Sequence, residues 1–292
     1  MFCKKFKIGE CNMVNCWFDY KTVIISGASS GIGKGLVKKL ISEHGCTVIG
    51  IARNETKMKA LVSELGDKAR YFSYYLFDVA EKESWRSFAN DLIEKGIQPD
   101  ILINNAGILP KFNKFGHYSL DYIDRAMQVN FYSNVYSMNV MIPILLKSKS
   151  AGIVNISSSA ALCSLAGTSI YSASKAAVKS MTESIREEYR GRIYVGLVCP
   201  GFTKTDIFHN QDRGNETGMN DKMLDMVSTS CERMVNDIVN VIWIKKSNMV
   251  FGIDARMMHD STRFFGVLTS KVSSAVIRKA HLEMFKDVFY SE

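Results

Sequence analysis

Short apolar runs alternate with helical repeats along the chain from residue 22 onward. The run 22–26 is β-branched, and after a glycine-rich turn apolar side chains recur at helical spacing from Leu36 to Ile41. This order predicts a strand, a glycine turn and a helix. Later runs of the same character predict strands at 47–51, 71–77, 101–103, 193–199 and 248–251, and one more from residue 153.

Three longer segments show the periodicity of amphipathic helices. Residues 121–149 form one continuous helical pattern, and Asn130 lies inside it. A second pattern begins at Tyr171, and Gly191 is placed to end it. A third spans 232–244. We therefore predict a helix in each segment.

Length and composition favour one catalytic domain. The 292 residues are 47% apolar and include only 4 prolines, which argues against long linkers. We predict a leader at 1–20, a catalytic domain at 21–255 and a helical tail at 256–292. The net charge of +8 suits anionic ligands, but the basic residues are scattered. Without an arginine-rich run or a zinc-finger pattern, nucleic-acid binding is not expected.

The cysteines and the N-terminal residues favour a cytoplasmic protein. No apolar run approaches the ~20 residues of a membrane span, and the first twenty residues lack the apolar core of a signal peptide. The 7 cysteines lie singly, as expected of reduced thiols. Cys3, Cys11 and Cys16 leave open a metal or redox cluster, but an irregular leader docked on the surface is preferred. No metal site is predicted.

Tyr171 and Lys175 lie four residues apart on a predicted helix, so their side chains share one face. A phenol ionises near pKa ~10 and needs a fixed positive charge to work as an acid or base at neutral pH. Lys175 supplies that charge. Ser158, at the end of the preceding strand, can direct its hydroxyl at the substrate oxygen. These residues predict a proton-transfer site, although such a tyrosine–lysine pair also occurs on solvated helices.

The turn after the first strand contains Gly27, Gly31 and Gly33. Glycines let the backbone turn tightly and let a pyrophosphate approach the N–H groups at the helix N-terminus, where the helix dipole favours negative charge. The strand before the turn and the helix after it favour a nucleotide site over an ordinary glycine-rich turn.

Arg53 follows the second strand, where an NAD site usually has an acidic residue about 20 residues past the glycine turn. No acid is present in Ala52, Arg53 and Asn54. The guanidinium of Arg53 suits a 2′-phosphate, and Ser30 lies in the turn that would flank the same group. We therefore predict NADP(H) in preference to NAD(H). An ordinary surface arginine is the alternative.

Several motifs together resemble the single-domain branch of the short-chain dehydrogenase/reductase family. They are the glycine turn, the Asn-Asn-Ala-Gly sequence at 104–107, the segment Asn-Ile-Ser-Ser-Ser at 155–159, and the segment that begins with Tyr171. The resemblance covers roughly residues 20–255. It implies an α/β fold, a doubly wound Rossmann-type and mostly parallel sheet with helices on both faces. The implied strand order is 3-2-1-4-5-6-7, with the cofactor across the carboxyl ends of the strands.

The resemblance also implies roles for individual residues. Tyr171 would be the acid in reduction and the base in oxidation, and Lys175 would lower its pKa and bind the nicotinamide ribose. Ser158 would position the substrate oxygen, and Asn130 would hold a water that links Lys175 to solvent. The cofactor residues would be Gly27, Ser29, Ser30, Gly31, Ile32, Gly33, Arg53, Asn54, Asp78, Val79, Asn105, Ala106, Gly107, Tyr171, Lys175, Pro200, Gly201, Thr203 and Thr205.

The expected function is an NADP(H)-dependent oxidoreductase that interconverts a ketone and a secondary alcohol on a hydrophobic substrate. A hydroxysteroid or bile acid is the first candidate, and a 3-oxoacyl or other long-chain lipid ketone is the alternative. Two readings of another class stay open, a non-catalytic NADP(H) sensor and a peripheral membrane protein. The resemblance also implies a homo-oligomer, a dimer or a tetramer.

Residues 206–230 are polar and contain Met219, Met223 and Met226, which suits a mobile lid over the substrate or an ordinary pair of surface helices. Two parts of the chain depart from the family pattern, the cysteine-bearing leader and the tail at 254–292. Residues 254–292 alternate apolar and basic groups. Such a tail could close the substrate site, touch a lipid headgroup boundary, or pack on its own core or a second subunit.

Overall fold

A parallel sheet forms the centre of the computed structural model of the protein. The structure describes residues 16–204, 228–266, 268–279, 281 and 285–290. The seven strands lie in the order β3-β2-β1-β4-β5-β6-β9, and every neighbouring pair is parallel. Their bounds are β1 Thr22–Ser26, β2 Thr47–Ala52, β3 Phe72–Leu76, β4 Ile101–Asn104, β5 Gly152–Ile156, β6 Tyr194–Pro200 and β9 Asn248–Phe251. The predicted fold class and strand order are confirmed.

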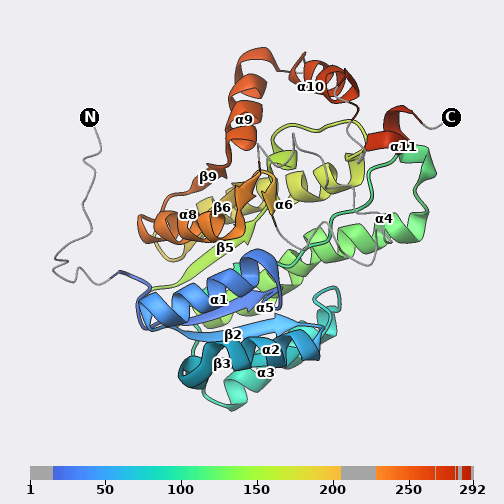
Figure 1. Cartoon of the computed structure of the whole chain (residues 1–292). Helices are drawn as coiled ribbons and strands as arrows, with labels where there is room; N and C mark the ends of the chain where they lie inside the picture. Colours follow the sequence, from blue (N-terminus) through green and yellow to red (C-terminus); the bar gives the residue numbers. More distant parts are fainter. Residues whose placement is uncertain (1–15, 205–227, 267, 280, 282–284, 291–292) are drawn as a thin grey trace, which may run out of the picture.

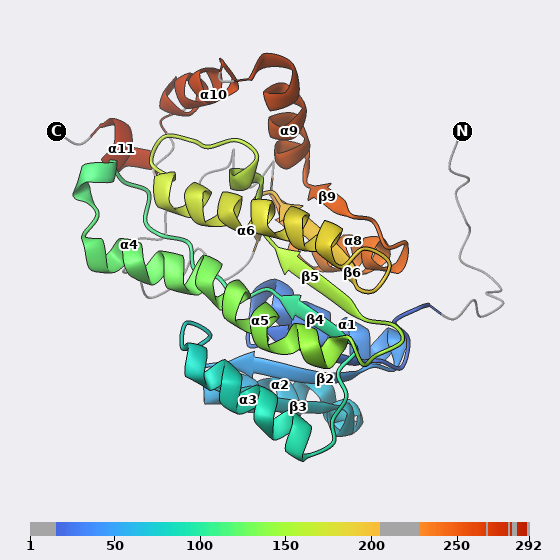
Figure 2. The ribbon, with the colours of Figure 1, turned by 180° about the vertical axis from the view of Figure 1, so that it is seen from behind.

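Helices cover both faces of this sheet (Figures 1 and 2). Side chains alternate along a strand, so Val23 and Ile25 join the core under one layer while Ile24 joins the other. The first layer consists of α1 (Gly31–His44), α2 (Glu55–Leu65) and α8 (Cys231–Trp243). The second consists of α3 (Lys82–Glu94), α4 (Leu120–Met127), α5 (Ser133–Leu145) and α6 (Ser169–Glu188).

A π-helical turn interrupts the long helix predicted for 121–149. This turn, η3 (Gln128–Tyr132), lies between α4 and α5. It widens the helix by one residue and brings Asn130 into the interior, where this side chain is fully buried. A single π-turn of this kind is often found at functional sites. The prediction of one uninterrupted α-helix was therefore wrong at these residues.

Short elements complete the domain. The helical turns η1 (Gly66–Tyr71), η2 (Phe115–His117) and η4 (Ser159–Ala161) precede β3, α4 and α6 respectively. β7 (Thr203–Lys204) pairs with β8 (Thr229–Ser230) beyond the end of β6. From the predicted leader, the Trp17 indole donates to the carbonyl of Ile242 at 2.8 Å, and Phe18 is buried in the core.

The described residues of the C-terminal segment include three helices, α9 (Ile253–Phe265), α10 (Leu268–Lys279) and α11 (Lys286–Phe289). The helices α9 and α10 pack on each other and stand away from the sheet, whereas α11 lies near α4 (Figure 1). Phe285, just before α11, is buried against Phe112, with ring centroids 4.8 Å apart. The tail thus returns to the domain beside the carboxyl ends of the strands.

Candidate active site

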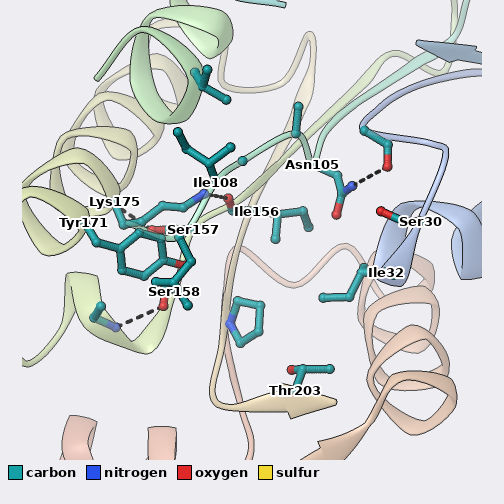
Figure 3. A pocket seen from close by; sticks show the side chains of 18 of the residues that line it. Ser30, Ile32, Asn105, Ile108, Ile156, Ser157, Ser158, Tyr171, Lys175 and Thr203 are labelled. Atoms are coloured by element: carbon teal, nitrogen blue, oxygen red, sulfur yellow. Dashed lines mark hydrogen bonds between the residues drawn. The ribbon is translucent and has the colours of Figure 1, made fainter. Parts of the chain in front are cut away.

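A cavity of about 600 Å³ runs along the carboxyl ends of the strands, from the glycine turn to the start of α6. Figure 3 shows its two ends, with Ser30 and Ile32 at one and Tyr171 and Lys175 at the other. Most of the predicted site residues line it. They are Gly27, Ser29, Ser30, Gly31, Ile32, Arg53, Asn54, Asp78, Val79, Asn105, Ala106, Gly107, Ser158, Tyr171, Lys175, Pro200, Gly201 and Thr203.

The glycine turn has backbone angles that favour glycine. Gly27 has φ of 69° and Gly31 has φ of 51°, both in the left-handed region. Gly33 does not line the cavity, but an added Cβ there would overlap the carbonyl of Gly27. Ser30 precedes α1, whose first turn contains no acidic residue. The N-terminus of α1 therefore opens into the cavity as a site for an anion.

The Asn-Asn-Ala-Gly sequence ties this turn to the centre of the sheet. The Asn105 side chain donates to the carbonyls of Ser26 and Gly27 at 3.1 and 3.2 Å, and the Ser26 hydroxyl accepts from the backbone of Ala106. Asn104 donates to the side-chain oxygen of Asn155 at 2.8 Å, which links β4 to β5. These bonds hold the rim of the cavity in place.

Two arginines meet at the carboxylate of Asp78, beyond the end of β3. The Arg125 guanidinium is 2.6 Å from Asp78 Oδ2, and Arg53 Nη1 lies 3.5 Å from the same oxygen. The Arg53 side chain is 61% exposed, whereas that of Arg125 is about half as exposed. Burial raises the pKa of Asp78, but the backbone N–H of Ala80 and the two cations outweigh that effect and lower it. Arg125 was not predicted as a site residue, because it lies on α4, far from Asp78 in the sequence.

Ser158, Tyr171 and Lys175 meet at the other end of the cavity (Figure 3). Ser158 follows β5 and accepts from the backbone N–H of Ala160 at 3.2 Å. Tyr171 and Lys175 lie one turn apart on α6, with the ammonium 6.0 Å from the centre of the phenol ring. Ser157 donates to the carbonyl of Lys175 at 2.8 Å, which fixes α6 against the end of β5.

Lys175 is a buried cation. Its ammonium donates to the carbonyl of Ile156 at 3.1 Å, and the residue is 4% exposed. Burial, which penalises the charged form, lowers the pKa of Lys175 to about 8. The amine still carries its proton for most of the time at pH 7. An added Cβ on Gly107 would lie 3.3 Å from this nitrogen, so glycine leaves room around it.

We expect Lys175→Met to stabilise the protein without ligand at pH 7. A lysine pKa that falls from 10.5 to about 8 on folding corresponds to a cost of roughly 3 kcal/mol. The cost applies in full below pH 8 and disappears above pH 10.5, because the amine is then neutral in both states. Denaturant unfolding should show that Lys175→Met increases the free energy of unfolding by less at pH 10 than at pH 7. Lys179→Met, on a half-exposed lysine paired with Glu183, is the control. A lower free energy of unfolding for Lys175→Met at pH 7 would contradict the argument.

Asn130 lies behind the cavity wall rather than in it. Its side-chain oxygen accepts from the N–H of Ile108 at 2.8 Å, and its amide donates to the carbonyl of Ile108 and to the Ser174 hydroxyl. An added Cβ on Gly107 would lie 3.3 Å from both Asn130 Oδ1 and Lys175 Nζ. The π-turn therefore places Asn130 across Gly107 from the lysine.

A buried carboxylate holds the Pro-Gly turn at the end of β6. Asp254 accepts from the N–H of Phe202 at 2.8 Å, and an added Cβ on Gly201 would overlap this carboxylate. Burial raises the pKa of Asp254. Thr203 lines the cavity, and Thr205 lies outside the described residues. Asp254, at the start of α9, was not predicted as a site residue.

Apolar side chains form the wall beside Tyr171. They come from loops and from the tail, so no local sequence pattern marks them. Five of them line the cavity: Leu109, Phe112, Leu165, Phe202 and Met258. Behind Leu109 and Phe112 lies Phe285, which is 1% exposed.

Some of the remaining predictions fall on residues outside the described ranges. Cys3, Cys11 and most of the proposed lid at 206–230 lie outside the described residues. Within the described ranges, Cys16 and the other four cysteines are free thiols, and no cluster of histidine, cysteine or acidic residues could hold a metal. No helix in those ranges is long and apolar enough to cross a bilayer.

The sheet is doubly wound, a glycine turn leads into an open helix N-terminus, and a cavity runs along the strand ends. These features define a dinucleotide-binding protein. Comparisons with known proteins narrow this class. A sequence profile for the short chain dehydrogenase family matches residues 21–216. The chain therefore belongs to the short-chain dehydrogenase/reductase family, whose fold binds a nicotinamide cofactor, and it is an oxidoreductase of that family.

Individual relatives differ in the compounds that their names mention. The NADPH-dependent pterin aldehyde reductase of Arabidopsis thaliana is 33% identical over 64% of this chain and 76% of its own. The 3beta-hydroxysteroid dehydrogenase 2 of Eggerthella lenta is 29% identical over 68% and 77%. The 3-oxoacyl-[acyl-carrier-protein] reductase of Rickettsia felis is 30% identical over 82% and 94%. A solved short-chain dehydrogenase from Streptomyces avermitilis has a TM-score of 0.71 at 25% identity, over 88% of this chain and 98% of that one.

Proposed function

We propose that the protein is an NADP(H)-dependent oxidoreductase that interconverts a ketone and a secondary alcohol on a hydrophobic substrate. One observation carries this proposal: a single cavity joins the glycine turn to Ser158, Tyr171 and Lys175. When bound, the nicotinamide supplies or accepts the hydride. The chain's own residues bind and orient both reactants and transfer the proton.

Tyr171 is the proposed acid in reduction and base in oxidation. The buried ammonium of Lys175 lies 6.0 Å from the ring centre, where its positive charge favours the phenolate form that takes up the proton in oxidation. Ser158 directs its hydroxyl at the substrate oxygen. Asn130 supports Lys175 from across Gly107 through a water relay to solvent, in keeping with its position behind the cavity wall.

The cofactor site fits a dinucleotide with a 2′-phosphate. The N-terminus of α1 can hold the pyrophosphate, since the first helical turn has no acid to repel it. Arg53 and Ser30 line the cavity near that helix and can hold the additional phosphate. The name of the Arabidopsis relative includes NADPH dependence, which supports the same choice.

The apolar wall beside Tyr171 favours a hydrophobic ketone. Phe112, Phe202 and Met258 provide contact area without charge, which suits a steroid, bile acid or long acyl chain. The relatives' names include a hydroxysteroid and a 3-oxoacyl compound, and both belong to this class.

The proposal is tested by NADPH oxidation against a panel of carbonyl compounds. The panel should contain steroid, bile-acid, 3-oxoacyl and small ketones, and turnover is expected with large apolar members. Lys39→Met, a substitution on α1 away from the cavity, serves as the control protein. Tight NADPH binding without turnover of any compound would favour the non-catalytic sensor instead.

We expect Phe285→Ala to raise KM for a steroid-sized ketone far more than for a small one. Phe285 packs behind Phe112 and Leu109, so its loss should loosen the apolar wall. Proton transfer by Tyr171 should not be affected directly. Phe264→Ala is the matched control, because Phe264 is 79% exposed on the same tail. Equal changes in KM for large and small ketones, in a folded variant, would contradict a role in substrate binding.

A further inference from the structure

The helices α9 and α10 expose apolar side chains at helical spacing. Leu268, Val272 and Val276 follow one another four residues apart on α10 and are 52%, 54% and 50% exposed. On α9, Met257 is 65% and Phe264 is 79% exposed. Both helices stand off the sheet at the same end of the molecule (Figures 1 and 2). We call the exposed residues of these two helices the tail face.

Basic groups accompany the apolar groups on the tail face. Between residues 253 and 279 five basic side chains are exposed: Arg256, Arg263, Lys271, Arg278 and Lys279. Of the two acids in the same stretch, Asp254 is buried, and Asp260 lies 3.0 Å from its neighbour His259. The tail face is therefore both apolar and strongly positive.

We propose that the tail face binds the surface of an anionic lipid bilayer. Exposed apolar side chains can enter the headgroup boundary while arginines and lysines meet acidic headgroups. A second copy of the chain is a poorer occupant, because a two-fold contact would bring the same positive groups together. A surface contact also agrees with the absence of a membrane-spanning helix in the described ranges.

The helix α9 borders the cavity, and α10 packs on the apolar group that supports the cavity wall. Met258 on α9 lines the cavity, and Ile277 on α10 packs on the apolar group that contains Leu109 and Phe285. The helices that contact lipid thus form part of the wall that separates lipid from the cavity. The proposed lipid contact would therefore lie next to the substrate end of the cavity, which goes beyond the proposed chemistry.

Sedimentation with lipid vesicles tests the proposal on the full chain. We expect binding to phosphatidylcholine vesicles that contain phosphatidylserine, weaker binding to phosphatidylcholine alone, and a loss of binding as salt is raised. The double variant Lys271→Glu/Lys279→Glu should lower the partition coefficient for anionic vesicles by at least about tenfold. Val272→Ser/Val276→Ser should weaken binding to both kinds of vesicle.

A matched charge reversal elsewhere controls for net charge. Lys147 and Lys149 are exposed beyond the end of α5, and Lys147→Glu/Lys149→Glu should keep the parental partition coefficient. Equal losses in the two double variants would overturn the proposal, as would no binding of the unmutated chain to anionic vesicles. A dimer that dissociates on Val272→Ser/Val276→Ser would assign the tail face to a second copy. Because these measurements record partition and mass, they are independent of turnover.

Discussion

Tyr171→Phe should reduce ketone turnover by roughly 10²–10⁴-fold while leaving the Kd for NADPH within a few fold of the parent. The substitution removes only the hydroxyl that transfers the proton, and general acid catalysis contributes about that much to a rate. The ring stays in place against its apolar neighbours, and Lys175 is unchanged. Steady-state turnover and NADPH fluorescence titration measure the two quantities separately.

Tyr189→Phe provides the control for this experiment. Tyr189 ends the same helix, α6, and does not line the cavity, so its loss of a hydroxyl should leave turnover unchanged. Turnover of Tyr171→Phe within a few fold of the parent would remove Tyr171 as the acid. A matching fall in NADPH affinity would show instead that the phenol binds cofactor.

Short-range patterns predicted the sheet and both ends of the cavity. Strands such as β1 and β4 occur at the residues that the apolar runs indicated, because a strand buried on both faces needs an unbroken apolar segment. The glycine turn and the spacing of Tyr171 and Lys175 are also local. They fix which side chains share a helix face before any tertiary contact is known.

The features that the sequence did not predict depend on tertiary contacts. The spacing of apolar residues cannot distinguish a continuous α-helix from one that contains a single π-turn. The inward position of Asn130 is shown instead by its hydrogen bonds to Ile108 and Ser174. Arg125 and Asp78 are far apart in sequence, and their ion pair requires α4 to pass the end of β3. The apolar wall is likewise assembled from loops and the tail.

The ion pairs of Asp78 affect how freely Arg53 can bind a cofactor phosphate. Arg53 is the more distant of the two cations, at 3.5 Å against 2.6 Å for Arg125. If Arg53 turns toward a 2′-phosphate, Asp78 keeps Arg125 as a partner and is not left as an uncompensated charge. The structure thus provides an exposed guanidinium that can change partner at low cost.

Arg53→Asp should reverse the cofactor preference from NADPH to NADH. One charge-assisted contact to the 2′-phosphate is worth about 1.5–3 kcal/mol, or roughly ten- to a hundredfold in Kd. The new carboxylate adds repulsion against that phosphate and offers an acceptor to the ribose hydroxyl of NADH. Arg70→Asp makes the same charge change outside the cavity and should leave the ratio of the two Kd values unchanged. Comparable Kd values for NADPH and NADH in the unmutated protein would refute the role of Arg53, because the contact would then contribute nothing to the choice between the two cofactors.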